Sequence, residues 1–390
     1  MKWKFYSLAF VAGMSILTAY SCDDNNDNDG NGGNGNGNEI ENGTILKGTI
    51  TSDVTLAAGN TYKLSGEYIV EEGATLHIEE GVKIIAVYDD IADYILVKQG
   101  GKINAVGTSD KPIVMTSEKE EPGAWGGIHI CGRAHTNAEG GKGSSEIGGA
   151  VYGGNDDADN SGTLQYIRLE YTGFAFDEEH EANGISFYGV GNGTIVDHCQ
   201  AYKGSDDGFE FFGGSVNVSN LVAVSCSDDS FDWTEGWNGK GTNLVAYQEA
   251  ESTLGYDCDC LMECDNNGSN NAATPVAHPV LKNLILVGNG GSKQGIRLRA
   301  GTEVEIDNAK VCGKGQPLTV ETALTENALK NSTSKLTNIT LTAELSSKEG
   351  IYTHADFIAV TSNKVDANLS YSSFEDIRKE CSWMNGSWVK

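Results

Sequence analysis

Apolar and polar residues alternate in short runs along most of the chain, and glycine or asparagine separates one run from the next. From about residue 43, runs such as TLHIEEGVKIIAV and YILVKQGGKINAVG carry an apolar side chain at nearly every second position. Alternation with a period of two is typical of a β-strand with one buried face. No helical pattern of comparable strength occurs before residue 320. The sequence therefore predicts an all-β body over residues 43–390.

One acidic, aromatic phrase is written twice in succession, as GSDDGFEFFGG at 204–214 and CSDDSFDWTEG at 226–236. Its equivalent residues lie 22 positions apart, which is the length of one coil of a solenoid. The pairs at this spacing are Asp206 and Asp228, Asp207 and Asp229, and Phe209 and Phe231. Because side chains alternate along a strand, we expect Phe209 and Phe231 to point inward and Glu210 and Asp232 outward.

Two further phrases fit the same frame, NGISFYG at 183–189 and GIRLRAG at 295–301. Stacking them predicts two outward rows beside each other. These rows are Ser186, Glu210, Asp232 and Arg297, and Tyr188, Phe212, Thr234 and Arg299. Two polar, turn-rich stretches, 135–162 and 251–278, interrupt the rhythm and are predicted to be long loops that protrude beside this surface. The helical spacing of SFEDIRKECSW, at 373–383, predicts a cap over the end of the coils.

The stretch GGKINAVGTSDKPIVMTS, followed by PGAWGGIHICGRA, resembles the right-handed parallel β-helix proteins of the pectate-lyase-like superfamily, particularly exported Bacteroidetes proteins. The resemblance covers about residues 43 to 315. It implies a single-stranded, right-handed parallel β-helix solenoid, with coils of about 22 residues and long protruding loops. The motifs are specific for this architecture and do not select one activity.

The N-terminus has the pattern of a targeting segment. Lys2 and Lys4 precede the apolar run FYSLAFVAGMSILTAY, and Ser21-Cys22 resembles a bacterial lipoprotein cleavage site. We therefore expect a signal peptide over 1–21, lipidation of Cys22, and a disordered acidic, Gly/Asn-rich tether over 22–42. The acids behind Cys22 resemble the surface-export signal of Bacteroidetes lipoproteins. This predicts a lipid-anchored protein of the outer membrane, exposed at the cell surface, with a periplasm-facing body as the alternative.

The net charge of the chain limits which classes of partner it can bind. Lys and Arg number 27 against 55 Asp and Glu, a net charge of −28, which repels nucleic-acid phosphates and excludes nucleic acid as a partner. An acidic polysaccharide would need a local basic patch or bound cations.

The cysteine count bears on disulfide bonds. Of nine cysteines, eight remain once Cys22 is assigned to lipid, and an even number in an exported chain favours disulfide bonds. Metal binding by the three thiols of CDCLMEC is the less favoured alternative, because their spacing is not that of a paired C-x-x-C zinc site.

The repeated acids are the strongest candidates for chemistry. By resemblance to polygalacturonases, Asp206-Asp207 and Asp228-Asp229 match an Asp-Asp element, and QGIRLRAG is similar to an Arg-Ile-Lys element. The Gly-His-Gly element of that family is absent, which disfavours this activity. The catalytic candidates are Asp206, Asp207, Asp228, Asp229 and Arg297. A lyase is the second enzymatic hypothesis, with Ca²⁺ held by Asp206 and Asp228 and with Arg297 or Arg299 as the base.

The ligand-binding candidates are Glu210, Asp232, Tyr188, Arg299 and Trp237, since carboxylates and aromatic rings near loops suit a carbohydrate surface. The structural alternative assigns the Asp pairs to turn capping, with Ca²⁺ incidental.

The favoured function is a surface lipoprotein that binds carbohydrate or another surface component. The alternatives are a lyase or glycoside hydrolase acting on an acidic polysaccharide, and an architectural coat or adhesin protein. A cleft in which Glu210, Asp232 and Arg297 converge would favour the first two, and a flat face the third.

The anchor hypothesis predicts that Cys22→Ser releases the protein from membranes without unfolding its body, because a disordered tether separates lipid from core. Membrane fractionation with circular dichroism of the released protein measures both effects. Retention of the variant in the membrane pellet would contradict the prediction.

Overall fold

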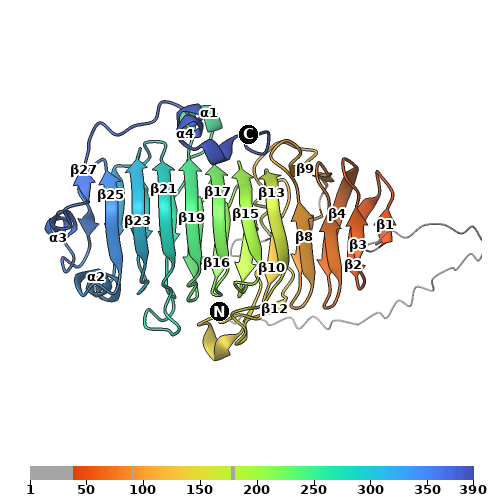
Figure 1. Cartoon of the computed structure of the whole chain (residues 1–390), viewed down its shortest axis with the longest axis horizontal. Helices are drawn as coiled ribbons and strands as arrows, with labels where there is room; N and C mark the ends of the chain where they lie inside the picture. Colours follow the sequence, from red (N-terminus) through yellow and green to blue (C-terminus); the bar gives the residue numbers. More distant parts are fainter. Residues whose placement is uncertain (1–37, 90, 177–180) are drawn as a thin grey trace, which may run out of the picture. The chain divides into compact units, whose positions relative to one another are not determined.

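The protein is a right-handed parallel β-helix whose strands form three faces of a coil. The computed structural model describes residues 38–89, 91–176 and 181–390 (Figure 1). The coil that the sequence predicted is confirmed. Phe209 pairs with Phe231, and Glu210 pairs with Asp232, in parallel register.

The first and second faces merge along the chain. The first face comprises β1 (Asn38–Ile40), β3 (Val54–Leu56), β5 (Thr75–Ile78) and β8 (Lys102–Val106). The second comprises β2 (Ile45–Ile50), β4 (Thr61–Val70), β6 (Lys83–Ala86) and β9 (Ile113–Ser117). From β13 (Gly162–Glu170) on, one bent strand serves both faces, because its first half pairs with β8 and its second half with β9. The later bent strands are β15 (Ile195–Tyr202), β17 (Asn217–Val224), β19 (Lys240–Tyr247), β21 (Val280–Val287), β23 (Glu305–Cys312) and β25 (Lys335–Leu341), and the short β27 (Lys364–Val365) pairs with β25.

The bend within each strand is a residue with positive φ, and asparagine occupies it in five successive coils. Asn220 has φ of 55° and Asn243 has φ of 60°; asparagine tolerates this left-handed conformation better than most residues. The side-chain amides form a ladder: Asn243 Nδ2 donates to Asn220 Oδ1 at 2.8 Å, and Asn283 Nδ2 to Asn243 Oδ1 at 3.0 Å. The ladder continues to Asn308. It holds successive coils in register at the corner.

The third face carries the repeated acidic phrase. It begins at the ends of β2 and β4 and continues through β7 (Tyr94–Val97), β10 (Ile128–Cys131), β14 (Ile185–Tyr188), β16 (Phe209–Phe212), β18 (Phe231–Thr234), β20 (Met262–Cys264), β22 (Gln294–Leu298), β24 (Gln316–Val320) and β26 (Ser346–Ser347). Inside the coil, aromatic rings stack from one turn to the next. The Phe209 and Phe231 centroids lie 5.6 Å apart, and those of Phe187 and Phe211 lie 5.0 Å apart.

The two predicted loops differ from expectation in detail. Residues 135–162 include a small hairpin, β11 (Gly143–Ser144) and β12 (Val151–Tyr152), and pack Ile147 and Tyr152 over the third face. Residues 251–278 begin with α1 (Glu251–Leu254) but also contain β20, which pairs with β18 and β22. This stretch therefore supplies a full strand to the third face.

The C-terminal part has α2 (Ala323–Lys330), α3 (His354–Ala359) and α4 (Phe374–Glu380). The sequence SFEDIRKECSW, predicted as an end cap, lies instead along the side of the coils (Figure 1). Ile377 and Trp388 pack there against an apolar strip that includes Val245 and Ile285. The element that packs at the end of the core is α3, whose Phe357 is fully buried in it.

The disulfide prediction is wrong for the described residues, because all eight of their cysteines are free and buried thiols. A free cysteine packs in a protein core as a small hydrophobic residue, so an even number of cysteines does not require disulfide bonds. In residues 38–89, 91–176 and 181–390, no helix is both long and apolar enough to cross a membrane. The signal peptide, Cys22 and residues 22–37 of the predicted tether lie outside the described residues. Residues 38–42, also predicted as tether, instead contain β1, which pairs with β3.

The coil register predicts that Phe231→Ala lowers the free energy of unfolding by about 3 to 5 kcal/mol, because Phe231 is 1% exposed and its ring stacks on Phe209. The control Ile195→Ala removes an apolar side chain that is 53% exposed and should change stability by less than about 0.5 kcal/mol. Urea unfolding followed by tryptophan fluorescence measures both. Equal costs would contradict an inward Phe231.

Candidate acidic binding site

One outward row of the third face changes from apolar to acidic to basic along the stack. Strand pairing sets its members side by side in the order Ile69, Leu96, His129, Ser186, Glu210, Asp232, Glu263, Arg297 and Thr319. The loop of residues 135–162 covers the apolar part. The acidic part is left open, so the polar segment of the row becomes the floor of a cavity.

The cavity has a volume of about 410 Å³ and is lined by ten carboxylates and one guanidinium. Glu146 comes from the loop of residues 135–162, Asp259 from the loop before β20, and the others from the third face and its approaches. The lining is Glu146, Glu181, Asp206, Asp207, Glu210, Asp228, Asp229, Asp232, Asp259, Glu263 and Arg297. Glu210, Asp232 and Arg297 thus converge, which favours a ligand site over a flat architectural face.

The two aspartates of each repeated pair have different roles. Asp207 and Asp229 are buried, and each accepts a hydrogen bond from the backbone of the following coil. Asp207 Oδ1 accepts from the Asp229 N–H at 2.8 Å, and Asp229 Oδ1 accepts from the Cys260 N–H at 2.5 Å. These two residues act as caps that tie coils together. Asp206 and Asp228 are more exposed and remain available to a ligand.

Burial, and then the crowding of like charges, raises the carboxyl pKa values. Burial, and then the charge of Asp228, raises the pKa of Asp206 to about 7. Burial, and then the charge of Asp259, raises the pKa of Asp228 to about 6. The pKa values of Glu210 and Asp232 lie well above the usual range, first through burial and then through neighbouring acids. Part of the cluster is therefore protonated near neutral pH unless a cation binds.

The carboxylates are close enough to share cations. Three groups of three have oxygens within 4.8 Å of one another: Asp206, Asp207 and Asp228; Asp207, Glu210 and Asp232; and Asp229, Asp232 and Glu263. The Oδ1 atom of Asp232 is also buried without a hydrogen-bond partner. Oxygen donors of this kind suit Ca²⁺, so the residues fit such an ion. A fourth group, which includes Cys260, fits less well, because burial raises the pKa of this thiol and keeps it protonated.

Both arginines of the predicted site are held in ion pairs. Arg297 Nη1 lies 2.8 Å from Glu263 Oε2, and its Nε lies 3.3 Å from Glu321 Oε1. Arg299 pairs with Glu263 and, at 2.7 Å, with Asp265.

These ion pairs decide the protonation of the arginines. Burial alone would lower the pKa of Arg297 and Arg299, but their acidic partners outweigh it and raise both pKa values. The ion pairs therefore disfavour the hypothesis that either arginine is a proton-abstracting base.

Two predicted aromatic ligand residues are not accessible. Tyr188 is fully buried beneath the loop of residues 135–162, where its ring stacks on Phe212 at 4.4 Å and its hydroxyl donates to Glu146. Trp237 is 1% exposed, stacks on Phe211 in the core, and donates from Nε1 to the Val216 carbonyl. Neither can stack on a sugar, so this part of the prediction is wrong.

Sequence reasoning missed four lining acids, Glu146, Glu181, Asp259 and Glu263. The alternation in LMEC marks Glu263 as outward, but the loop predicted over 251–278 includes this stretch. Asn183 was also not predicted as a site residue. It is 1% exposed, and its Nδ2 donates to Glu210 Oε2 at 2.5 Å and to Ser186 Oγ at 3.0 Å. Asn183 thereby fixes the position of Glu210 at one end of the cavity.

Residues 48–389 match the family model described as a pectate-lyase-like beta helix domain. The chain belongs to this family. Membership agrees with the parallel coil. No curated protein matches the sequence.

Among solved structures, the crystal structure of the Dettilon tailspike protein is similar to this chain at 8% identity and a TM-score of 0.31. The alignment covers 76% of this β-helix chain and 56% of the tailspike chain. The chain thus spans little more than half the length of the tailspike chain. A likeness this distant carries no argument about activity.

The raised pKa values predict that, in EDTA, the melting temperature falls as pH rises from 5 to 8. Unfolded aspartates release protons near pH 3.9, whereas Asp206 and Asp228 retain theirs to about 7 and 6, so the stability contributed by their protonation is lost across this interval. Asp206→Asn with Asp228→Asn should flatten the slope in differential scanning fluorimetry. The control Glu120→Gln with Glu344→Gln, two exposed acids outside the cavity, should keep it. A melting temperature that rises with pH in the wild type would contradict the prediction.

Proposed function

We propose that this β-helix protein binds polysaccharide at the acidic cavity, through Ca²⁺ ions held by Asp206, Asp228 and their neighbours. The observation that carries the proposal is the convergence of ten carboxylates and Arg297 in one open cavity between two loops. A surface that served only as a coat would gain nothing from such a cluster, because uncompensated buried acids oppose folding. A ligand that supplies positive charge removes this cost.

Charge selects the ligand chemistry. The cavity alone repels an anionic polymer, whereas bound Ca²⁺ can be shared between protein carboxylates and the carboxylates of a uronate chain. Ca²⁺ coordination by Glu263 would also compete with its ion pairs to Arg297 and Arg299. The released guanidinium groups would then be available to a carboxylate of the ligand. An acidic polysaccharide bound through Ca²⁺ therefore accounts for both the acids and the adjoining arginines.

Hydrolysis of the bound polymer is a second candidate, and one observation favours it. Asp206 and Asp228 have carboxyl oxygens within 4.8 Å of each other and pKa values of about 7 and 6. Near neutral pH one carboxyl can therefore donate a proton while another accepts one. The absence of the Gly-His-Gly element argues against a polygalacturonase mechanism. The raised arginine pKa values argue against a lyase that uses Arg297 or Arg299 as base.

The location remains part of the proposal. Cys22, the apolar stretch before it and the acidic tether behind it support a lipid anchor at the outer membrane and exposure at the cell surface. Exposure at the cell surface would allow the cavity to meet polymers outside the membrane.

The binding proposal predicts that the protein retains uronate-containing polysaccharides in affinity electrophoresis with Ca²⁺ and loses this retention in EDTA. Asp206→Asn with Asp228→Asn should weaken retention at least about tenfold, because two shared ligands of the ion are removed. The control Glu120→Gln with Glu344→Gln should bind as the wild type does.

The same samples, assayed for reducing ends and for unsaturated uronate absorbance, separate binding from cleavage. New reducing ends without unsaturated product would favour hydrolysis, and unsaturated product would revive a lyase. Calcium-independent retention, or retention unaffected by the double variant, would overturn the assignment of the cavity.

A further inference from the structure

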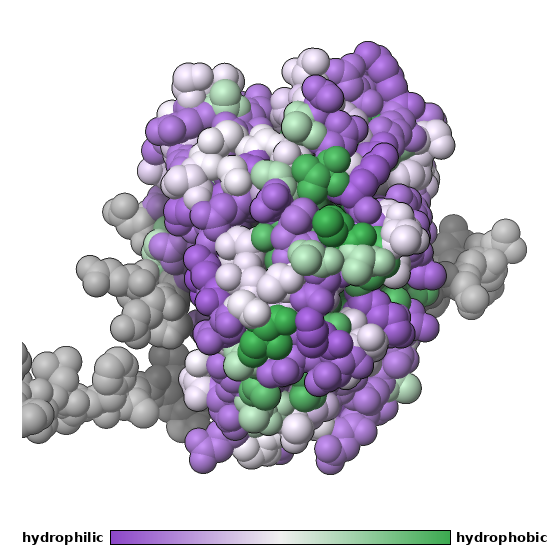
Figure 2. Space-filling model, turned by 90° about the vertical axis from the view of Figure 1, so that its left-hand side faces the viewer, coloured by the Kyte–Doolittle hydropathy of each residue, from purple (hydrophilic) through white to green (hydrophobic). Residues whose placement is uncertain are grey.

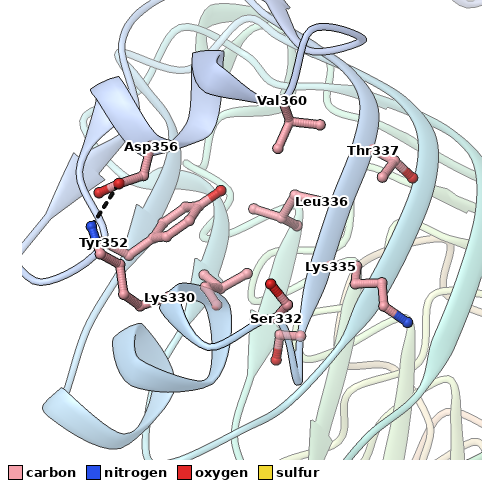
Figure 3. Close-up of a pocket in the computed structure, with 10 residues that line it drawn as sticks. Lys330, Ser332, Lys335, Leu336, Thr337, Tyr352, Asp356 and Val360 are labelled. Carbon is pink, nitrogen blue, oxygen red and sulfur yellow. Dashed lines mark hydrogen bonds and ion pairs between the residues drawn. The ribbon is translucent and has the colours of Figure 1, made fainter.

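A second cavity, of about 490 Å³, lies near the end of the coil stack, between α2, β25 and α3 (Figure 3). Its size is in the range of small-molecule sites. It shares no lining residue with the acidic cavity. The inference drawn from it does not rest on the function proposed above.

Tyr352 presents an unused hydroxyl to this cavity. The residue is 6% exposed, and its hydroxyl points into the open space (Figure 3). Among the described residues, none forms a hydrogen bond with the Tyr352 hydroxyl. Burial raises the pKa of Tyr352 to about 12, so the phenol stays protonated and can both donate and accept. The hydroxyl is not among the buried side-chain atoms that lack a partner, so it faces the open space of the cavity. A ligand that enters the cavity can therefore form a hydrogen bond with it in place of water.

The charges at the cavity are already paired. Lys330 Nζ lies 2.6 Å from Asp356 Oδ1, and its hydrogen bond lowers the pKa of Asp356 to about 2. Lys335 Nζ lies 2.9 Å from Glu305 Oε1, outside the cavity. Neither lysine is therefore left as a counter-ion. A neutral ligand fits this balance better than an acid or an amine.

The remaining walls combine apolar and hydroxyl groups. Leu329 and Leu336 are buried, and Val360 stands at the opening with 36% of its surface exposed. Ser332 adds a hydroxyl on the side opposite Val360 (Figure 3). Figure 2 shows that apolar side chains gather on this end of the molecule among hydrophilic ones. The ligand must therefore offer an apolar face and hydrogen-bonding edges together.

We propose that this cavity binds one neutral saccharide ring. A pyranose has C–H faces that can contact Leu336 and Val360 and hydroxyl edges that can bond to Tyr352, and it carries no charge. A fatty chain would leave the phenol unpaired, and a charged metabolite would meet no free counter-ion. The site would thus recognise a neutral sugar, in contrast to the anionic polymer expected at the acidic cavity.

Saturation-transfer NMR on the full chain tests this proposal with methyl glycosides of glucose, galactose, mannose and N-acetylglucosamine, each at millimolar concentration and in EDTA. At least one should receive saturation from the protein. Tyr352→Phe removes only the hydroxyl and should weaken binding about tenfold, the loss expected for one buried hydrogen bond. Because that hydroxyl has no partner in the protein, the melting temperature should not fall.

Val360→Trp, which fills the opening, should abolish the signal and provides a second variant if Tyr352→Phe folds poorly. The matched control Tyr88→Phe changes a tyrosine that is 52% exposed and lies outside the cavity, so it should leave the signal unchanged. Asp206→Asn with Asp228→Asn should also leave it unchanged, which separates this site from the acidic one.

Absence of saturation transfer for every sugar, or transfer that persists in Val360→Trp, would overturn the proposal. Light scattering that shows dimers dissociated by Val360→Trp, without sugar binding, would assign the apolar end to a second copy of the chain instead.

Discussion

In-register parallel pairing is the constraint on which the structure depends. Adjacent strands of a parallel sheet lie about 4.8 Å apart, so each side chain lies directly beside its equivalent in the next coil. Inside the coil this constraint is favourable, because Phe209 stacks on Phe231. Outside it is costly, because Glu210 must lie beside Asp232, and Asp232 beside Glu263. The same geometry therefore builds the core and concentrates negative charge on one face.

The protein resolves part of that repulsion within its own fold. Asp207 and Asp229 accept backbone hydrogen bonds from the next coil, and Arg297 and Arg299 neutralise the acids at one border of the cavity. These contacts do not remove the repulsion, because burial and then neighbouring acids still raise the pKa values of Asp206, Asp228 and Asp232. Natural proteins retain destabilising groups mainly where function requires them. Asp206, Asp228 and Asp232 are for this reason the centre of the proposed function.

The cavity near α3 follows the opposite logic. Its charged groups are closed into ion pairs, and the hydroxyl groups of Tyr352 and Ser332 face the open space. The two cavities thus differ in what they offer a ligand. The acidic cavity offers negative charge, and the cavity near α3 offers hydrogen-bonding groups. Two chemically distinct ligands can be recognised on one β-helix because the side chains outside the coil vary freely, provided that the inward residues continue to stack.

Periodicity alone identified the coil, because alternation and a spacing of 22 residues reflect local strand geometry, as the pairing of Phe209 with Phe231 confirms. It could not place Glu263, since the loop inserted before β20 lengthens that coil and hides the spacing. Nor could it show that Tyr188 and Trp237 are covered, that the cysteines stay unpaired, or that Ile377 packs along the side of the coils. Those outcomes depend on where loops and the C-terminal segment fold back over the coils. Contacts between residues so far apart in the chain leave no periodic signal, and only the tertiary structure decides them.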